Sequence, residues 1–454
     1  MRKAIIVAGL LFLLSSGSVW ASGLAIPEQG TAALGLSAAM TARNEDLSAI
    51  YYNPAALDYV QGFEIYAGIT PIAPGHSFAP FREDRDYFDE TDAESNIYLP
   101  PQLYAAWRAS SHVVLGVGVY APFGLGTEWE DDWAGRYTST FAEITTIYIN
   151  PTIAINVTDK VSLGLGASYI TSDATIEKMV DTGAKLVMGT DPMYDSKFGL
   201  EGDGDAFSVN AGVLYKPAST VQLGVSYRSA YEIEYEGDAK FKHQALFQGI
   251  PYPLNTAISM SDVLYSQMPE TQSGTATLRM PWQLNFGAFF RLTEKLNTSA
   301  DLDFVGWDRY EDLTIDFDDD LPSDKSTQDK DWENSWILRG GASYDYTEKL
   351  VLRGGLMYDS NPVPDETMDG QLPDSDRVGI SAGVGYKMGR VRLDAAYMLL
   401  AFRDRDKDNG VGFSTDTTGD GTIDRFDVPN GYPTGNGKYS SRAHLFSVAM
   451  SIAF

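Results

Sequence analysis

Short alternations of apolar and small or polar residues recur along the chain from residue 62 onward. In VSLGLGASYI, residues 161–170, apolar side chains at the odd-numbered positions alternate with glycine and serine from Ser162 to Ser168. This period of two is that of a β-strand with one apolar face and one small or polar face. The pattern predicts fourteen strands, at about residues 62–73, 98–109, 112–121, 138–157, 161–176, 204–215, 220–234, 274–290, 295–308, 334–346, 349–359, 376–388, 391–402 and 439–454.

The connections between these strands are of two lengths. Tight turns such as SSH, TDK, TEK and MGR alternate with long acidic stretches such as residues 81–96 and 316–334. An even strand number, with short turns at one end and long loops at the other, is typical of outer-membrane barrels. Closure is required because each orphan backbone group in lipid costs on the order of several kcal/mol. Residues 62–454 are therefore predicted to form an all-β, 14-stranded antiparallel transmembrane β-barrel.

Both ends of the chain fit export to a bacterial outer membrane. Residues 1–21 have the pattern of a secretory leader, with Arg2 and Lys3, a short apolar run and a cleavage region ending at Ala21. The mature chain is expected to start near Ser22. The last strand presents an apolar row that ends at Phe454, which is typical of barrels recognised by the barrel assembly machinery.

The composition excludes several classes of function. The 454 residues include no cysteine, which excludes thiol catalysis and thiolate metal sites. The formal net charge of -28 argues against nucleic acid as a partner. With four histidines and no Gly-x-Ser-x-Gly motif, a lipid-hydrolysing enzyme is disfavoured.

Three blocks of sequence carry a family resemblance. They are SGLAIPEQGTAALGLSAAMTARNEDLSAIYYNPAAL near the start, VYAPFGLGTEWEDDWAGRY, and MYDSNPVPDETMDGQLPDSDRVGISAGVGYKM. Together they make the mature chain similar to the FadL-type outer-membrane transporters of long-chain fatty acids and hydrocarbons. The resemblance implies passive transport of a hydrophobic ligand by a barrel that works as a monomer among outer-membrane lipid and lipopolysaccharide.

The resemblance also implies that residues 22–61 fold inside the barrel as a plug, called the hatch below. The Ala- and Gly-rich start of this segment has helical character. Pro54 disfavours helix at Asn53, whose side chain can close a turn before Ala55. The alternative is a periplasmic arm with an incidental turn.

A break in the wall is predicted at Pro122, Phe123 and Gly124, where the alternation that starts at Val113 stops. Proline removes a ladder donor and glycine permits a bend. By resemblance, the third strand kinks inward here and opens a lateral exit to the outer leaflet. Alternatively, Pro122 simply ends the strand.

Arg339, Arg353 and Arg377 have the parity of lumen-facing residues, as do Asp301 and Asp303. On the lipid face an arginine would cost about 2 to 4 kcal/mol at mid-depth. One interpretation is a charge-balanced ladder that braces the wall. The other is that an unpaired arginine binds a carboxylate head group. Arg377 is the first choice because the family motif PDSDR falls on it.

Two loops contain apolar patches suited to ligand capture. One includes Leu186 and Val187, the other Phe247 and Ile250. The resemblance implies a first, weaker ligand site in a groove between such loops. The alternative is that the patches cover each other and the barrel mouth.

The last long loop contains DTTGDGTIDRFD, which has the spacing of a calcium loop. The expected ligands are Asp416, Thr418, Asp420, Thr422, Asp424 and Asp427. Threonine at the third position and aspartate at the twelfth depart from the usual pattern, and Asx turns are the alternative. Any calcium would be structural, and no cofactor is required for transport.

The best-supported function is passive transport of hydrophobic molecules, most simply long-chain fatty acids, by loop capture, lumen binding and lateral exit. Uptake of uncharged alkanes or monoaromatics by the same route is the main alternative. A general porin would instead conduct ions steadily.

Overall fold

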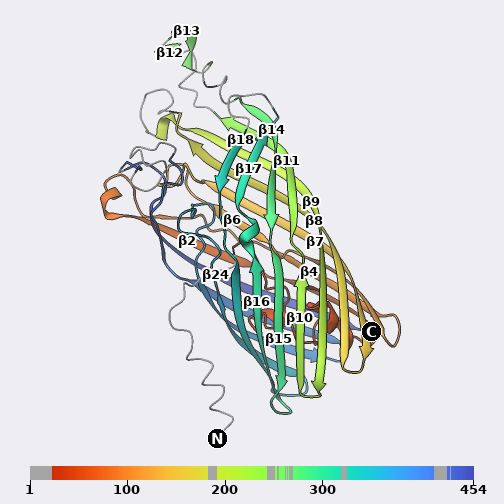
Figure 1. Cartoon of the computed structure of the whole chain (residues 1–454). Helices are drawn as coiled ribbons and strands as arrows, with labels where there is room; N and C mark the ends of the chain where they lie inside the picture. Colours follow the sequence, from red (N-terminus) through yellow and green to blue (C-terminus); the bar gives the residue numbers. More distant parts are fainter. Residues whose placement is uncertain are drawn as a thin grey trace.

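A computed structural model describes residues 23–454, apart from 183–191, 243–250, 253–254, 261, 263, 265–268, 319–324, 414–426 and 430. Strands dominate and form a tilted barrel with short turns at one end and long connections at the other (Figure 1). Every named strand pair is antiparallel, and β1 pairs with the last strand, β24, to close the wall. No helix in these described stretches is long and apolar enough to cross a membrane.

The wall has fourteen strands, which confirms the predicted fold class. Four of them are made of two runs each. In chain order the fourteen wall strands are β1 (Phe63–Ile69) with β2 (Ile72–Pro80), β4 (Pro101–Arg108), β5 (Val113–Tyr120) with β6 (Gly124–Glu128), β7 (Phe141–Thr158), β8 (Val161–Val180), β9 (Ser196–Ala218), β10 (Val221–Arg228) with β11 (Tyr231–Lys242), β14 (Thr271–Met280) with β15 (Trp282–Arg291), β16 (Leu296–Gly306), β19 (Ser335–Asp345), β20 (Leu350–Asp359), β21 (Arg377–Met388), β22 (Val391–Phe402) and β24 (Gly437–Ala453).

Shorter elements lie among the long connections. They are β3 (Thr91–Asp92), β12 (Pro251–Tyr252), β13 (Asn255–Ser259), β17 (Asp312–Phe317), β18 (Lys325–Asp329) and β23 (Arg405–Lys407), with 3-10 turns η2 (Arg82–Asp84), η3 (Pro192–Tyr194) and η5 (Trp307–Arg309).

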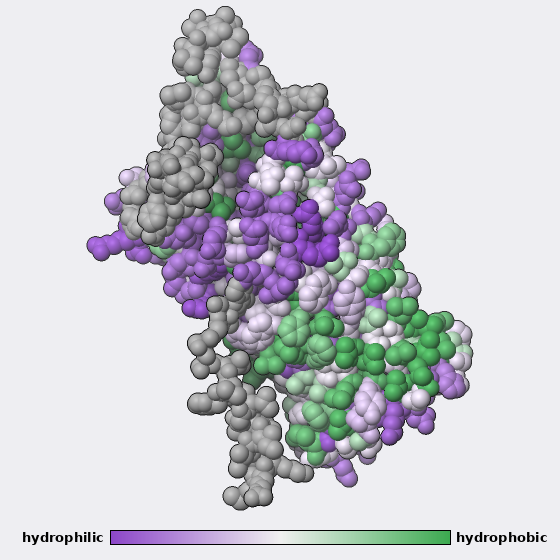
Figure 2. Space-filling view, in the orientation of Figure 1, coloured by the Kyte–Doolittle hydropathy of each residue, from purple (hydrophilic) through white to green (hydrophobic). Residues whose placement is uncertain are grey.

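The burial pattern is inverted relative to a soluble protein. In β8, Leu163 and Leu165 are exposed, whereas Ser162 and Ser168 are buried. Figure 2 shows the corresponding hydrophobic surface around the short-turn half of the barrel, with hydrophilic surface towards the long connections. An apolar outer band with a polar interior is the arrangement that suits a barrel in lipid.

Several strands differ from the predicted ranges. The predicted strand 274–290 is two runs, separated at Pro281, which has no N–H to donate. β8 and β9 pair as far as Val180 and Ser196, well beyond the predicted ends. Ile176 and Met179 therefore belong to the wall. Past the lipid band the strict alternation of apolar and small or polar residues that located the strands is lost.

The hatch lies inside the barrel from Gly23 onward and contains α2 (Thr31–Leu34), α3 (Ala49–Tyr52) and η1 (Pro54–Tyr59). Hydrogen bonds and ion pairs link it to inward-facing side chains around the wall. These join Thr31 to Tyr66 and Ser447, Ser37 to Ser381, Thr41 to Asp301, Arg43 to Ser299, and Asp46 to Arg392.

Glycines of the wall make room for η1. A Cβ atom on Gly164 would lie 2.3 Å from the backbone nitrogen of Ala55, and one on Gly212 would lie 2.0 Å from Oδ1 of Asn53. Both distances are too short for real contacts, so a side chain at either position would collide with the hatch. The small inward-facing residues of β8 and β9 therefore form the surface on which η1 packs.

Candidate functional site

The third wall strand is interrupted between Tyr120 and Gly124. β5 pairs with both β4 and β7, but β6 pairs with β7, and no described residue joins β6 to β4 in a ladder. The ladder with β7 resumes when Gly124 pairs with Thr145, so Pro122 does not end the strand. The second and third strands therefore separate beside Pro122, Phe123 and Gly124. Beyond the break, the connection before β4 contacts the third strand, where Glu94 N donates to Glu128 O over 2.8 Å.

The first residues of the hatch occupy this break from inside. Ile26 N donates to Pro122 O over 2.8 Å, and Gly124 N donates to Leu24 O over 3.1 Å. Ala25 and Phe123 form an antiparallel bridge. We call this pairing of Leu24–Ile26 with Pro122–Gly124 the clasp, because it holds the hatch directly against the broken strand.

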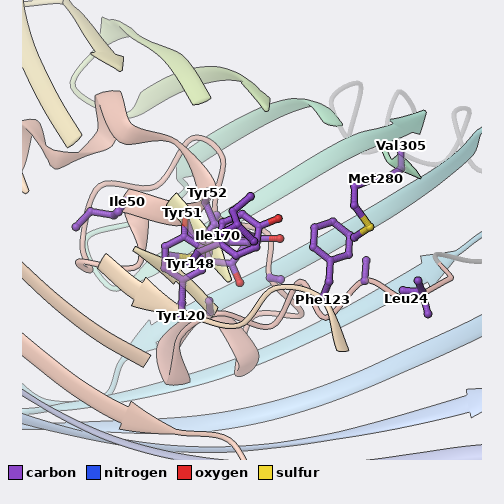
Figure 3. Packing of buried hydrophobic residues seen from close by; sticks show 14 of the residues in the cluster. Leu24, Ile50, Tyr51, Tyr52, Tyr120, Phe123, Tyr148, Ile170, Met280 and Val305 are labelled. Carbon is purple, nitrogen blue, oxygen red and sulfur yellow. The ribbon is translucent and has the colours of Figure 1, made fainter. Parts of the chain in front are cut away.

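Phe123 points into the lumen and is only 1% exposed. Its ring lies 6.4 Å from that of Tyr148 and edge-on to that of Trp307 at 6.2 Å, measured between centroids. Figure 3 shows Phe123 between a group of tyrosines and Leu24 of the hatch. The aromatic side chain fills the lumen side of the break.

A cavity of about 500 Å³ adjoins the break and is called the lateral cavity. Its lining combines hatch residues Ala25 and Ile26, lumen residues such as Arg377, and Ile97 and Leu99 from the chain before β4. Ile97 is 67% exposed on the outside of the barrel. The lining of the lateral cavity thus extends from lumen residues to exposed residues of the connection before β4.

A second cavity, of about 110 Å³, lies towards the long connections and is called the loop-side cavity. Its lining is mostly apolar, and it shares Glu143, Ile144 and Leu372 with the lateral cavity. Leu24 of the clasp lines it too. The two cavities therefore adjoin at these shared residues, beside the first residues of the hatch.

Lys330 supplies an ammonium group to the loop-side cavity. Its Nζ donates to Asp369 Oδ2 over 2.8 Å and to Gln371 Oε1 over 3.2 Å. Lysine has three N–H donors, so within the described residues one of them remains available. Sequence periodicity missed Lys330 because it lies in a long acidic connection, just after β18, where no alternation marks an inward position.

Each of the three predicted arginines has an aspartate partner. Arg377 donates to Asp359 over 2.8 Å, Arg339 to Asp303 over 2.8 Å and Arg353 to Asp394 over 2.9 Å. This geometry is that of a charge-balanced ladder. Arg377 alone of the three lines the lateral cavity, where its guanidinium also lies 5.5 Å from the ring of Phe402.

An arginine that the sequence analysis did not select has no carboxylate partner among the described residues. Arg228 is buried, donates to Tyr51 O over 3.1 Å and lies over the rings of Tyr51, Tyr120 and Tyr148. The parity of VQLGVSYR, in which Gly224, Ser226 and Arg228 share a face, contains the signal that could have identified it.

Asn53 closes the turn before η1. Its Oδ1 accepts from Ala55 N over 3.1 Å, and its Nδ2 donates to Thr41 O over 2.7 Å and Val213 O over 3.1 Å. Pro54 is the first residue of η1, where its missing N–H costs nothing. The three residues Asn53, Pro54 and Ala55 hold the far end of the hatch against β9 and β8.

Other predicted residues fall outside the described part of the chain. They are Leu186, Val187, Phe247, Ile250, Asp416, Thr418, Asp420, Thr422 and Asp424. Asp427 is described and buried. Within the described ranges no three or more His, Asp or Glu side chains are grouped to hold a metal ion. The capture patches and the calcium loop stay predictions.

Residues 12–454 match the family described as outer membrane protein transport protein (OMPP1/FadL/TodX). The chain belongs to this family. Among its FadL-family relatives, the long-chain fatty acid transport protein of Escherichia coli O6:H1 is 24% identical over 429 residues, covering 87% of this chain and 90% of the relative. Outer membrane protein P1 of Haemophilus influenzae is 25% identical over 426 residues, covering 86% and 88%.

Solved FadL-family structures share the fold. A Pseudomonas aeruginosa FadL homologue superposes with a TM-score of 0.79 at 20% identity, covering 95% of this chain and all of that one. The Pseudomonas putida toluene transporter TodX gives a TM-score of 0.67 at 13% identity, covering 96% and 99%. The FadL-family chain is thus an outer-membrane transporter of hydrophobic molecules.

Proposed function

We propose that this FadL-family chain carries long-chain fatty acids across the outer membrane. The observation that carries the proposal is the pair of adjoining, largely apolar cavities, with one lysine ammonium in the lining of the loop-side cavity. An alkyl chain can lie along the apolar lining while its carboxylate accepts a charge-assisted hydrogen bond from Lys330. A ligand without a head group would gain nothing from Lys330.

In this proposal the ligand enters from the long connections, binds first in the loop-side cavity and then passes Ile144 and Leu372. The clasp lies across this passage, since Leu24 lines one cavity and Ala25 and Ile26 line the other. Loosening of the clasp admits the ligand to the lateral cavity, beside Arg377. It leaves between the second and third wall strands. Diffusion along this route needs no energy source.

Lys330→Met is expected to weaken binding of oleic acid by about ten- to a hundredfold, because a hydrogen bond to a charged group contributes about 1.5 to 3 kcal/mol. Binding of octadecane should be unchanged. Equilibrium binding to the detergent-purified protein measures both. Lys349→Met, at a tight turn on the outside of the molecule, serves as the control for loss of a positive charge.

Asp369→Asn separates head-group binding from a purely structural role of Lys330. If the carboxylate of Asp369 competes with the ligand for the ammonium group, this variant should bind oleic acid more tightly. Weaker binding in both variants would show that the ion pair merely supports the cavity. Equal effects on acid and alkane would favour uptake of uncharged hydrocarbons by the same route.

A further inference from the structure

Glu28 is a buried carboxyl group of the hatch that lines the lateral cavity. It is 3% exposed, and its Oε1 atom has no hydrogen-bond partner in the described part of the chain. Gln102, on the second wall strand, donates to the backbone oxygen of Glu28 over 3.0 Å. Glu28 is therefore held at the edge of the opening with an unused carboxyl oxygen.

The charges around Glu28 come from several elements. Arg339 on β19 is the nearest cation, with Nη1 3.8 Å from Oε1, and Arg377 lies at the start of β21. Each of these arginines is already paired, with Asp303 and Asp359 respectively. The other titratable groups lining the cavity are Asp374, Glu143, Tyr98 and His76, the last bonded to Ser441.

Glu28 thus shares its nearest cation, Arg339, with Asp303. Burial raises the pKa of Glu28, and the two arginines only partly oppose this effect. Burial also raises the pKa of Asp374, to about 6, although its Oδ2 atom accepts a hydrogen bond from Gly23 N over 2.8 Å. Burial at the lateral cavity thus opposes ionisation of these two carboxyl groups.

A fatty acid in the lateral cavity must lose the charge of its carboxylate before it can enter the membrane at low cost. An ionised carboxylate is very costly to move into hydrocarbon, whereas a neutral acid is not. Two carboxyl groups close together in a buried site do not both ionise, so they share a proton. On the basis of the proposed function, we propose that Glu28 donates a proton to the carboxylate of a fatty acid in the lateral cavity, so that the cargo enters the membrane as the neutral acid.

The atoms and charges of this proton transfer balance, and water is the only other reagent that it needs. The O–H bond of Glu28 breaks, and an O–H bond forms on the cargo. The resulting Glu28 carboxylate lies beside Arg339, whose Nη2 has no hydrogen-bond partner among the described residues and can donate to it. A hydronium ion from bulk water then restores the neutral carboxyl group of Glu28.

The test compares uptake of radiolabelled oleic acid and oleyl alcohol by cells that lack their own fatty acid transporter and express the full chain. In Glu28→Gln, uptake of the acid should fall by about a hundredfold or more near neutral pH, which is the lower end of what loss of a general acid costs. Uptake of the alcohol should stay unchanged. The deficit should shrink when the external pH is lowered by about two units, because bulk protons then supply the neutral acid.

Two further variants keep the test decisive. Glu28→Asp retains a carboxyl group and should restore much of the acid uptake. Glu45→Gln changes another hatch carboxylate, one that pairs with Arg43 and does not line the cavity, and should have no cargo-specific effect. Uptake is normalised to the amount of each variant in the outer membrane.

Equal loss of acid and alcohol uptake in Glu28→Gln would overturn the inference and assign Glu28 to hatch structure alone. Unchanged uptake of both would overturn it as well. A wild-type chain that carried the alcohol but not the acid would instead overturn the proposed fatty acid function, and this inference with it.

Discussion

A disulfide bond between Ala25→Cys and Phe123→Cys is expected to stop transport under oxidising conditions, and its reduction should restore transport. The two residues face each other in the antiparallel bridge of the clasp. Directly opposed antiparallel residues have Cα atoms about 4.5 to 5.5 Å apart, which is within reach of a disulfide. The natural chain has no cysteine, so no other pairing can form. The bond would fix the hatch across the route between the cavities.

Uptake of labelled oleic acid before and after addition of a reducing agent measures the effect. The single variant Phe123→Cys controls for loss of the aromatic side chain, and Ala25→Cys for the other position. Full uptake by the oxidised double variant, with the disulfide verified by mass spectrometry, would show that ligand passes without opening the clasp.

Gly164→Val is expected to convert the plugged barrel into an ion-conducting pore. The new side chain would collide with the backbone of Pro54 and Ala55 in η1, since a Cβ atom alone already lies 2.3 Å from Ala55 N. Overpacking of this kind typically costs about 1 to 3 kcal/mol, and a backbone contact cannot be relieved by a side-chain rotation. Because valine suits a strand, the wall should survive while the hatch leaves its seat.

Single-channel conductance in a planar bilayer measures the result, and circular dichroism verifies the strand content. Gly340→Val is the matched control, because a Cβ atom at Gly340 meets nothing within 4 Å. It should remain as poorly conducting as the wild type. If Gly164→Val conducted as poorly as the control, the hatch would have to accommodate the valine by shifting without opening a pore, which would contradict the prediction.

The alternation of apolar and small or polar residues predicted the strands of the wall and which of their side chains face inward. Leu163 and Leu165 face lipid, and Arg339, Arg353 and Arg377 are buried in the lumen, because a lipid environment enforces a strict inside and outside along each strand. The same logic explains why Ser162, Gly164 and their neighbours are small: they face the hatch.

Parity could not reveal what lies opposite a residue across the barrel. Glu28 and Lys330 belong to segments without alternation, and the cavities that they line are assembled from chain segments hundreds of positions apart. Similarly, the sequence pattern predicts that Arg377 faces inward but does not predict its partner. Only the strand register places Asp359 beside it. Register and loop placement depend on long-range pairing, which single-sequence periodicity does not encode.

The seam between β1 and β24 has a consequence for biogenesis. β1 follows the hatch directly, and its partner is the last segment of the chain to be exported, so the wall cannot close until the whole polypeptide has arrived. Thr31 of the hatch bonds across to Ser447 of β24 at 2.6 Å, next to this seam. The ring therefore closes, and this hatch tether forms, only after β24 is in place. A chain cut short before β24 loses the seam and this hatch tether together.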